Sequence, residues 1–506
     1  MDKFVKIVIR TVSGIVFAAA LAASVWLGYA SVFIGQTPDD NDITPVSYTD
    51  IDSSNTTEID DSLPTEETVN KKFVRITTNT YLRKKNSYNS EHIALLEKDS
   101  ECLYLNEDND YYNVACDDGK KGWVLKERSE LFEKDVVITH IPKNPVGDPF
   151  PMTDTKEGDD LGEIFKSYGT VGASLAIIKD GKVAYHYEYG YANKEKADNK
   201  ISITENTKYR IASVSKVFTS MLAMAEVEDG KLDLDAKLSD LFGFNFYNPK
   251  YPNTPVTMRM LLTHPAGLSG KEGLYSEPLI VVASGKDYYI YKPGNGFYYS
   301  NLGMGIAGAA VEKASDQTIS QYARDRFFQP MGIDASYDAS YLSDKSLVAD
   351  CYSNGSLKRS NEVLTRPMER KKGKPGDVYS LGQGGLLISA VDLAKISTLL
   401  LNDGVYDGKQ YLSHDSVEQI LTVHPVKTKS KYEQCIGIRK YTDLIGDRDM
   451  YYHTGSYYGI YALMAIDPND KSGVIVITSG AHSTREDNTI FEVCNAVLNY
   501  CYDGIL

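Results

Sequence analysis

The sequence predicts an α+β protein whose main part is one antiparallel sheet flanked by helices and joined to a helical lobe. A small all-β barrel and one transmembrane helix are expected before it. Three observations predict this fold class: hairpin-like strands at both ends of the C-terminal region, short strands ahead of it, and an apolar stretch that begins the chain. With 506 residues, of which 42% are hydrophobic, the chain can form two or more folded units.

Residues 1–35 have the composition of a membrane-entry segment. Lys3, Lys6 and Arg10 precede residues 11–35, which carry no charge. A run of this length can span a bilayer, which needs about 20 apolar residues. The basic residues before the run predict a cytoplasmic N-terminus and an extracellular body. We expect an uncleaved, single-pass anchor in the cell membrane; a signal peptide cleaved after Gly28-Tyr29-Ala30 is the alternative.

Residues 36–71 have the composition of a disordered acidic linker. They are rich in Asp, Glu, Ser and Thr, and no lysine or arginine occurs in the stretch before Lys71. This stretch accounts for most of the net charge of −15. The remaining chain has no basic excess, so nucleic acid is not an expected partner.

Residues 72–132 alternate short strand-like runs with turn signals, which predicts a small all-β domain. The expected strands are residues 73–76, 80–83, 92–96, 102–105, 111–116 and 122–125. The runs around Tyr81, Tyr111 and Trp123 resemble bacterial SH3-like domains, which often bind cell-wall peptides. A purely structural barrel is the alternative, because fold alone does not give function.

The six cysteines are too few for a disulfide framework in a chain of this size. Cys102 and Cys116 fall in the small domain and could pair. Cys494 and Cys501 lie in an expected helix, where a separation of about 10.5 Å at 1.5 Å per residue is too long for a bridge. No cysteine or histidine spacing indicates a metal site, and no cofactor is expected.

Residues 133–158 contain several prolines and are expected to form a second linker before the large domain, residues 159–506. The first hairpin of that domain is expected at residues 171–189, with an Asp-Gly turn. Another is expected at residues 460–478, followed by a helical tail over residues 485–502. Strands from both ends of the domain would then form a single sheet around an inserted helical lobe.

Three short motifs in this domain carry candidate chemistry. Ser213 and Lys216 form a Ser-x-x-Lys where a helix is expected to begin, so the two side chains share a face. Tyr299-Ser300-Asn301 precedes a helix rich in small residues, and His453-Thr454-Gly455 precedes the last hairpin. Each motif is weak alone, but their order along the chain is informative.

In this order the motifs resemble the active-site motifs of the class C β-lactamase-like serine hydrolases. This family includes serine D-alanyl-D-alanine carboxypeptidases, β-lactamases and esterases. The resemblance spans residues 161–502, and residues 260–268, 329–332 and 382–386 agree with it. It implies a β-lactamase or penicillin-binding-protein-like fold.

The resemblance also implies roles for the motif residues. Ser213 would attack a carbonyl and carry the acyl group, and Lys216 would facilitate removal of its proton. Tyr299 would shuttle that proton, since a neighbouring lysine stabilises a phenolate.

Substrate binding is expected from the second and third motifs. Asn301 would hold the substrate amide and fix the lysine. The backbone N–H of Ser456 would complete an oxyanion hole with that of the nucleophile. Gly455 would let the substrate approach an edge strand, and His453 and Thr454 would complete the binding site.

His453 distinguishes between members of the family. Many β-lactamases have lysine at this position, whereas histidine occurs in carboxypeptidase-like and esterase-like relatives. A histidine near neutral pH is only partly charged, so we expect a weaker, pH-dependent interaction with a substrate carboxylate. His264, in contrast, is expected to be a structural residue that ends a helix.

The sequence therefore predicts a membrane-anchored extracytoplasmic serine hydrolase, most simply a carboxypeptidase-like enzyme of cell-wall D-alanyl peptides. Its partner would be a cell-wall peptide or another small acyl substrate. An esterase or β-lactamase is the alternative among enzymes. A non-catalytic penicillin-binding sensor, acylated on Ser213 but not deacylated, is the alternative from another class.

Overall fold

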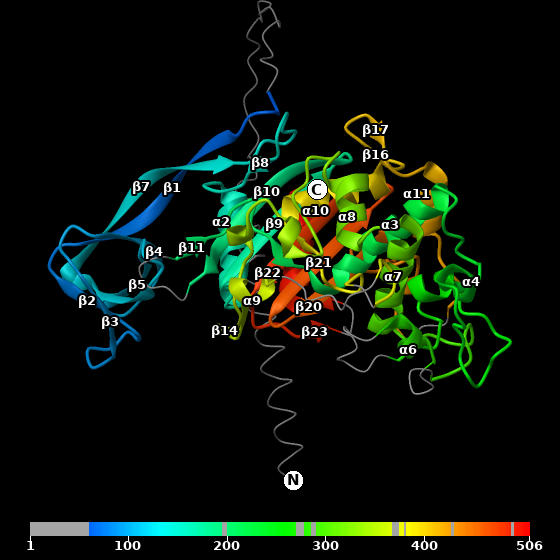
Figure 1. The fold of residues 1–506 in the computed structure, drawn as a ribbon. Helices are drawn as coiled ribbons and strands as arrows, with labels where there is room; N and C mark the ends of the chain where they lie inside the picture. The colour runs from blue at the N-terminus through cyan, green and yellow to red at the C-terminus, as the bar shows by residue number, and fades with distance from the viewer. Residues whose placement is uncertain are drawn as a thin grey trace, which may run out of the picture. The chain divides into compact units, whose positions relative to one another are not determined.

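The structure is a computed structural model (Figure 1). It describes residues 60–506 except 195–199, 270–277, 285–289, 367–373, 379–380, 427–429 and 487–489. The expected transmembrane helix and most of the acidic linker lie outside the described residues. Within the described ranges no helix is both long enough and apolar enough to cross a bilayer. The expectation of a single-pass membrane protein is corrected for these residues, which contain no membrane-spanning helix.

A seven-stranded antiparallel sheet forms the N-terminal part of the described chain, with the strand order β3-β2-β6-β5-β4-β1-β7. The strands are β1 (Thr65–Ile76), β2 (Thr80–Arg83), β3 (His92–Leu96), β4 (Glu101–Asp108), β5 (Tyr111–Ala115), β6 (Lys121–Leu125) and β7 (Ser129–His140). Five of the six expected strands are confirmed within a few residues, whereas the first begins eight residues earlier than expected. A small core of alternating apolar residues, including Val74, Leu82, Val114 and Val124, holds the sheet together.

The outer strands of this sheet differ from the linker predictions. β1 begins at Thr65, inside the expected acidic linker, and β7 continues to His140, inside the expected second linker. The two strands pair along their whole length, from Thr65 opposite His140 to Ile76 opposite Ser129. Both strands carry several charged side chains, so their composition did not predict a two-stranded ribbon.

The segment after β7 packs on the large domain. β8 (Phe150–Pro151) pairs with β10 (Lys182–Asn193) beside Tyr185, and Met152 is fully buried. The Tyr185 hydroxyl donates to the Pro142 carbonyl at 2.8 Å. This segment is therefore ordered against the large domain rather than acting as a free linker.

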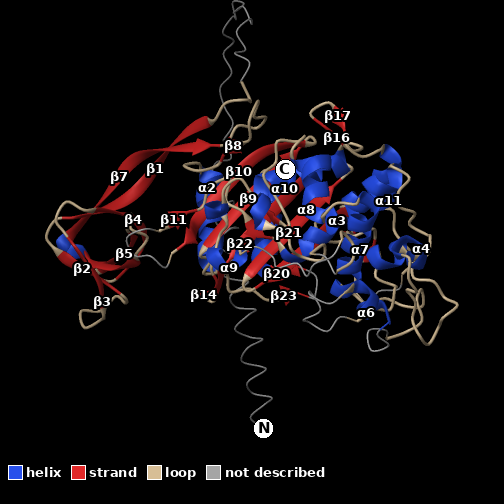
Figure 2. Cartoon of the chain, in the orientation of Figure 1, coloured by secondary structure: helices blue, strands red, loops and turns tan. Residues whose placement is uncertain are grey.

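The large domain is built on one main sheet with the order β11-β10-β9-β22-β21-β20-β19-β18 (Figures 1 and 2). Its strands are β9 (Gly172–Lys179), β10 (Lys182–Asn193), β11 (Ile201–Ser202), β18 (Glu433–Gln434), β19 (Arg439–Tyr441), β20 (Met450–Tyr457), β21 (Ile460–Asp467) and β22 (Ser472–Ser479). β9, from the start of the domain, pairs antiparallel with β22 from its end. The expected sheet from both ends of the domain is confirmed.

Alternate residues of the central strands point to two separate cores. Ala176 and Ile475 contribute to one core with the helical lobe, and Leu175 and Val474 contribute to the other. The first core includes α3 (Ser215–Glu228), α5 (Met258–Leu262), α7 (Asn301–Ser315), α8 (Ile319–Ala323), α10 (Ala390–Leu401) and α11 (His414–Leu421). The second lies beneath α2 (Lys156–Ser167) and α12 (Glu492–Gly504).

Short elements complete the domain. The helices are α4 (Leu238–Phe242), α6 (Leu279–Ser284) and α9 (Asn361–Leu364). The two-stranded pairs are β12 (Tyr209–Arg210) with β15 (Leu387–Ile388), β13 (Cys351–Ser353) with β14 (Ser356–Arg359), β16 (Val405–Tyr406) with β17 (Lys409–Gln410), and β23 (Arg485–Glu486) with β24 (Ile490–Phe491). Since β23 and β24 occupy its first residues, the expected tail helix starts only at Glu492.

The six cysteines are free thiols. Cys494 and Cys501 lie buried in α12, in agreement with the expectation that they do not bridge. Cys102 and Cys116 contact each other through a thiol hydrogen bond, which raises the pKa of Cys102 and lowers that of Cys116. The suggested pair is thus adjacent but not bonded.

Candidate active site

Ser213 lies in a single 3-10 turn, Ala212–Val214, that leads directly into α3. Ala212 has φ 48°, a conformation that non-glycine residues rarely adopt. Upstream, β12 pairs with β15, so Arg210 lies opposite Leu387. A strained residue between a paired strand and a buried helix fixes the direction of the Ser213 side chain.

Lys216 lies in the first turn of α3 and is fully buried. Its Nζ donates to Ser213 Oγ at 2.9 Å and to the Gln383 carbonyl at 2.6 Å. No carboxylate is among these partners. Burial, aided by the Arg439 charge, lowers the pKa of Lys216 even though Tyr299 opposes the shift. Lys216 therefore loses its proton at a lower pH than an exposed lysine does.

Tyr299 lies in the loop before α7, which Ser300 caps by accepting from Gly303 N at 2.8 Å. Lys216 Nζ lies 5.0 Å from the centroid of the Tyr299 ring, and the Arg439 guanidinium carbon lies 5.3 Å from it. Burial by itself favours the neutral phenol, but the charges of Lys216 and Arg439, with hydrogen bonds from Lys216 and Ser213, outweigh it. The pKa of Tyr299 is consequently lowered.

β20 packs against the turn that carries Ser213. β19 pairs with β20 only from Met450 to Tyr452, so the following residues leave that side of β20 open. A two-residue turn with positive φ at Tyr458 and Gly459 closes the hairpin of β20 and β21. Such a turn makes Tyr457 and Ile460 a hydrogen-bonded pair. The next pair, Ser456 with Tyr461, is then not hydrogen-bonded, so the Ser456 N–H points away from β21.

Gly455 is required by packing around the nucleophile. A Cβ atom at this position would lie 2.2 Å from the Ile211 carbonyl oxygen and 3.4 Å from Ala212 Cβ. Gly455 therefore has a packing role, and its expected role in the approach of substrate stays a prediction. Without a side chain, β20 can lie against the residues that precede Ser213.

His453 is buried on β20, and its Nδ1 donates to the carbonyl of Thr454, itself buried, at 2.8 Å. Burial, with the charges of Arg439 and Lys216, lowers the pKa of His453 well below the ordinary value. The imidazole is neutral at physiological pH. The expectation of a partly charged, pH-dependent group is therefore wrong for this structure.

His264 has a closer connection to the site than expected. It follows α5 with φ 72°, and its ring centroid lies 4.7 Å from that of Tyr299. Its Nδ1 accepts from Ser300 N at 3.3 Å. It is structural, as predicted, but what it positions is the loop that carries Tyr299.

Arg439 on β19 is a site residue that sequence reasoning missed. Its side chain is buried and packs over the rings of Tyr432, at 4.4 Å, and Tyr299. Its Nε has no hydrogen-bond partner, and no ion pair joins it to any described residue. No motif surrounds this arginine, so only the pairing of β19 with β20 could have located it.

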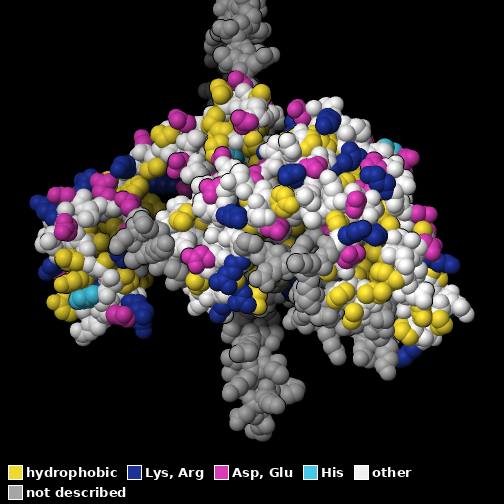
Figure 3. All heavy atoms as spheres, viewed as in Figure 1, with side chains coloured by type: hydrophobic (Ala, Val, Ile, Leu, Met, Phe, Trp, Pro, Cys, Tyr) yellow, Lys and Arg dark blue, Asp and Glu magenta, His cyan; other side chains and the backbone are white. Residues whose placement is uncertain are grey.

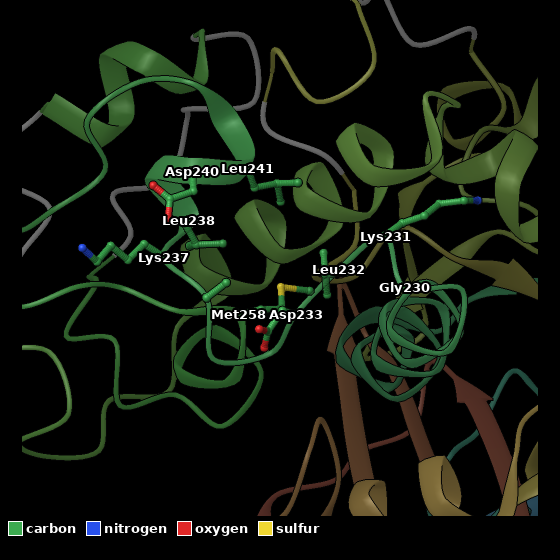
Figure 4. A pocket seen from close by; sticks show the side chains of 10 residues that line it. Gly230, Lys231, Leu232, Asp233, Lys237, Leu238, Asp240, Leu241 and Met258 are labelled. Carbon is green, nitrogen blue, oxygen red and sulfur yellow. The ribbon is translucent and has the colours of Figure 1, made fainter.

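A cleft of about 740 Å³ opens beside these residues, and Asn301 and Ser456 are among those that line it. Asn301, the first residue of α7, is exposed there. A separate hollow of about 240 Å³, between the end of α3 and α4, contains none of the motif residues (Figure 4). Among the described residues, no cluster of His, Cys, Asp and Glu suited to a metal ion is present.

A sheet made from both ends of a domain, with a serine on a 3-10 turn and a lysine on the first turn of the buried helix that follows, is typical of the β-lactamase-like serine hydrolases. Residues 154–493 match the Beta-lactamase protein family. The chain belongs to this family.

Protein flp of Staphylococcus aureus strain MW2 is 28% identical over 170 residues, covering 32% of this chain and 33% of that protein. The match thus covers about a third of this curated relative. The octameric penicillin-binding protein homologue from Pyrococcus abyssi has a TM-score of 0.52 at 24% identity, covering 65% of this chain and 73% of that one. The D-amino acid amidase from Ochrobactrum anthropi has a TM-score of 0.54 at 22% identity, covering 69% and 98%. These likenesses establish the fold.

Proposed function

We propose that this β-lactamase-family hydrolase forms an acyl-enzyme on Ser213 and acts as a carboxypeptidase on peptides that end in D-alanyl-D-alanine, such as those of the cell wall. The observation that carries the proposal is the hydrogen bond from Lys216 Nζ to Ser213 Oγ, 2.9 Å long, beside a tyrosine of lowered pKa. A nucleophile, a cation and a base are thereby together in one place.

The reaction follows from this arrangement. Ionised Tyr299 accepts the Ser213 proton while Oγ attacks the carbonyl carbon, and Lys216 stabilises the phenolate. The N–H groups of Ser213 and Ser456 bind the oxyanion. As the tetrahedral intermediate collapses, Tyr299 returns the proton to the leaving amine. Water, activated by the same tyrosine, then hydrolyses the acyl ester.

The charges beside Tyr299 favour a leaving group with a free carboxylate. His453 is neutral, so it supplies no positive charge. Arg439 is buried, positively charged and without an ion-pair partner among the described residues, and a substrate carboxylate would provide one. A terminal D-alanine meets this requirement, whereas a simple ester does not.

Turnover of a D-alanyl-D-alanine peptide tests the proposal. We expect purified protein to release D-alanine steadily, and Ser213→Ala to abolish the release. Ser87→Ala, which changes an exposed serine of the N-terminal sheet region, is the matched control. A fluorescent penicillin that labels Ser213 permanently, without peptide turnover, would favour the sensor. Hydrolysis of esters or β-lactams alone would favour the other enzymes.

A further inference from the structure

The cleft beside Ser213 has a distinct chemical character. Its lining combines two arginines with tyrosines, aliphatic residues and the polar groups of the site: Arg210, Asn301, Tyr337, Ala339, Val363, Leu364, Arg366, Leu381, Gly385, Leu387, Ser456, Tyr457 and Tyr458. We call this set the arginine cleft. None of these lining residues is acidic.

The two guanidinium groups of the arginine cleft are not neutralised by described carboxylates. Arg210 donates to the Gly384 carbonyl and to the Tyr457 hydroxyl, both at 3.1 Å, and neither acceptor carries a charge. Arg366 is exposed at the end of α9 and forms no ion pair with a described residue. Lys and Arg side chains also gather over α9 and β14 (Figure 3). In a chain of net charge −15, this local excess of positive charge indicates an anionic ligand.

The position of the cleft relates it to the acyl half of a substrate. Arg210 precedes Ser213 by three residues, so their Cα atoms lie at most about 11 Å apart. Leu381 and Leu387 provide an apolar wall within the same cleft. Arg439, which would hold the leaving group, is not part of this lining. A short aliphatic chain with a carboxylate at its end matches both the apolar wall and the positive charges of the cleft.

We propose that the arginine cleft selects substrates whose acyl portion carries a carboxylate on a short aliphatic chain, several bonds from the scissile carbonyl. This inference rests on the proposed acyl-enzyme function and specifies its substrate. Arg366 makes the ion pair with that carboxylate, and Arg210 adds a second positive charge deeper in the cleft. The tyrosines of the rim cover the aliphatic chain.

Two probes that differ in one group test the selection: N-glutaryl-D-alanyl-D-alanine and the same peptide with the glutaryl carboxylate converted to a carboxamide. We expect kcat/KM to favour the carboxylate probe by about fivefold or more, and the preference to decrease with added salt. Arg366→Gln should lower kcat/KM more for the carboxylate probe than for the carboxamide probe. Arg324→Gln, whose ion pair with Asp325 lies outside the cleft, is the matched control and should retain the preference.

The experiment distinguishes failure of the inferred charge selection from failure of the proposed carboxypeptidase function. Equal kcat/KM for both probes overturns the inference and leaves the proposed function standing. If neither probe is hydrolysed, the carboxypeptidase function is overturned. Charge selection is then measured by calorimetric binding of both probes to Ser213→Ala, where equal affinities overturn the inference. A preference that survives Arg366→Gln without change also overturns it.

Discussion

Tyr299 is the titratable group on which the charges of the site act. Lys216 supplies one positive charge near its ring, but the buried environment favours the neutral phenol. Arg439 on β19 supplies the second cation. The arrangement explains how a tyrosine in a buried site can serve as a base: two cations together exceed the cost of desolvation.

Arg439→Gln should shift the pH profile of activity. The Arg439 charge lowers the pKa of Tyr299, so its removal raises that pKa. Since the proposed reaction needs ionised Tyr299, the acid limb of kcat/KM should move to higher pH, and KM for a peptide with a free C-terminus should increase. Profiles of kcat/KM against pH for both proteins measure this. An acid limb that stays at the same pH would show that Arg439 does not affect the ionisation of Tyr299.

Buried neutral histidines should make the protein sensitive to acid. Burial lowers the pKa of His264 and of His453 well below the unfolded value, so below about pH 6.5 the unfolded chain binds more protons than the folded one. The free energy of unfolding should therefore decrease as the pH is lowered, by about 1.4 kcal/mol per pH unit for each histidine. His453→Gln should reduce this slope, measured by denaturant unfolding at several pH values. His414→Gln, which removes a histidine whose pKa Asp403 raises, should not reduce it.

At the scale of elements, the contact of β20 with the turn before α3 joins the two halves of the site. Gly455→Ala would bring a Cβ atom within 2.2 Å of the Ile211 carbonyl oxygen. We expect a loss of about 1–3 kcal/mol in unfolding free energy, as for other overpacked positions, together with a large loss of kcat. Thermal unfolding and turnover measure the two effects. Gly504→Ala, where an added Cβ meets nothing within 4 Å, is the control.

Elements with a strong local signal could be predicted from the sequence. The hairpins of β9 with β10 and of β21 with β22 follow from apolar runs divided by Asp-Gly and Asp-Pro turns. The extent of β1 could not, because its charged outer half is ordered only by pairing with β7. Likewise, β23 and β24 replace the start of the expected tail helix through tertiary pairing.

The candidate site likewise contains some residues that the sequence could identify and others that it could not. Ser213, Lys216 and Tyr299 stand in short motifs and could be identified without coordinates. The proximity of Arg439 and His264 to Tyr299 could not, since it depends on the pairing of β19 with β20 and on the packing of α5 against α7. The charge of His453 was also mispredicted. Burial, which a motif does not reveal, determines it.

At the scale of the whole molecule, the segment between β7 and α2 belongs energetically to the large domain. A fragment of residues 141–506 keeps the acceptors of the Tyr185 hydroxyl and the burial of Met152. A fragment of residues 154–506, which begins where the family match begins, loses both. We expect the shorter fragment to be less stable by about 3 kcal/mol, from one buried side chain and one unsatisfied hydroxyl. Equal unfolding midpoints would show that the segment is dispensable.

The main sheet also has a consequence for biosynthesis. Its first strands, β9 and β10, leave the ribosome long before β20 to β22, which supply the Ser456 N–H and cover the edge of β9. A nascent chain that already contains Ser213 therefore presents an open strand edge and lacks the N–H group that we propose for the oxyanion site. Premature termination anywhere before β20 yields an inert, aggregation-prone product rather than a hydrolase of relaxed selectivity. Translation from Met450 onward therefore decides whether the serine made earlier can react.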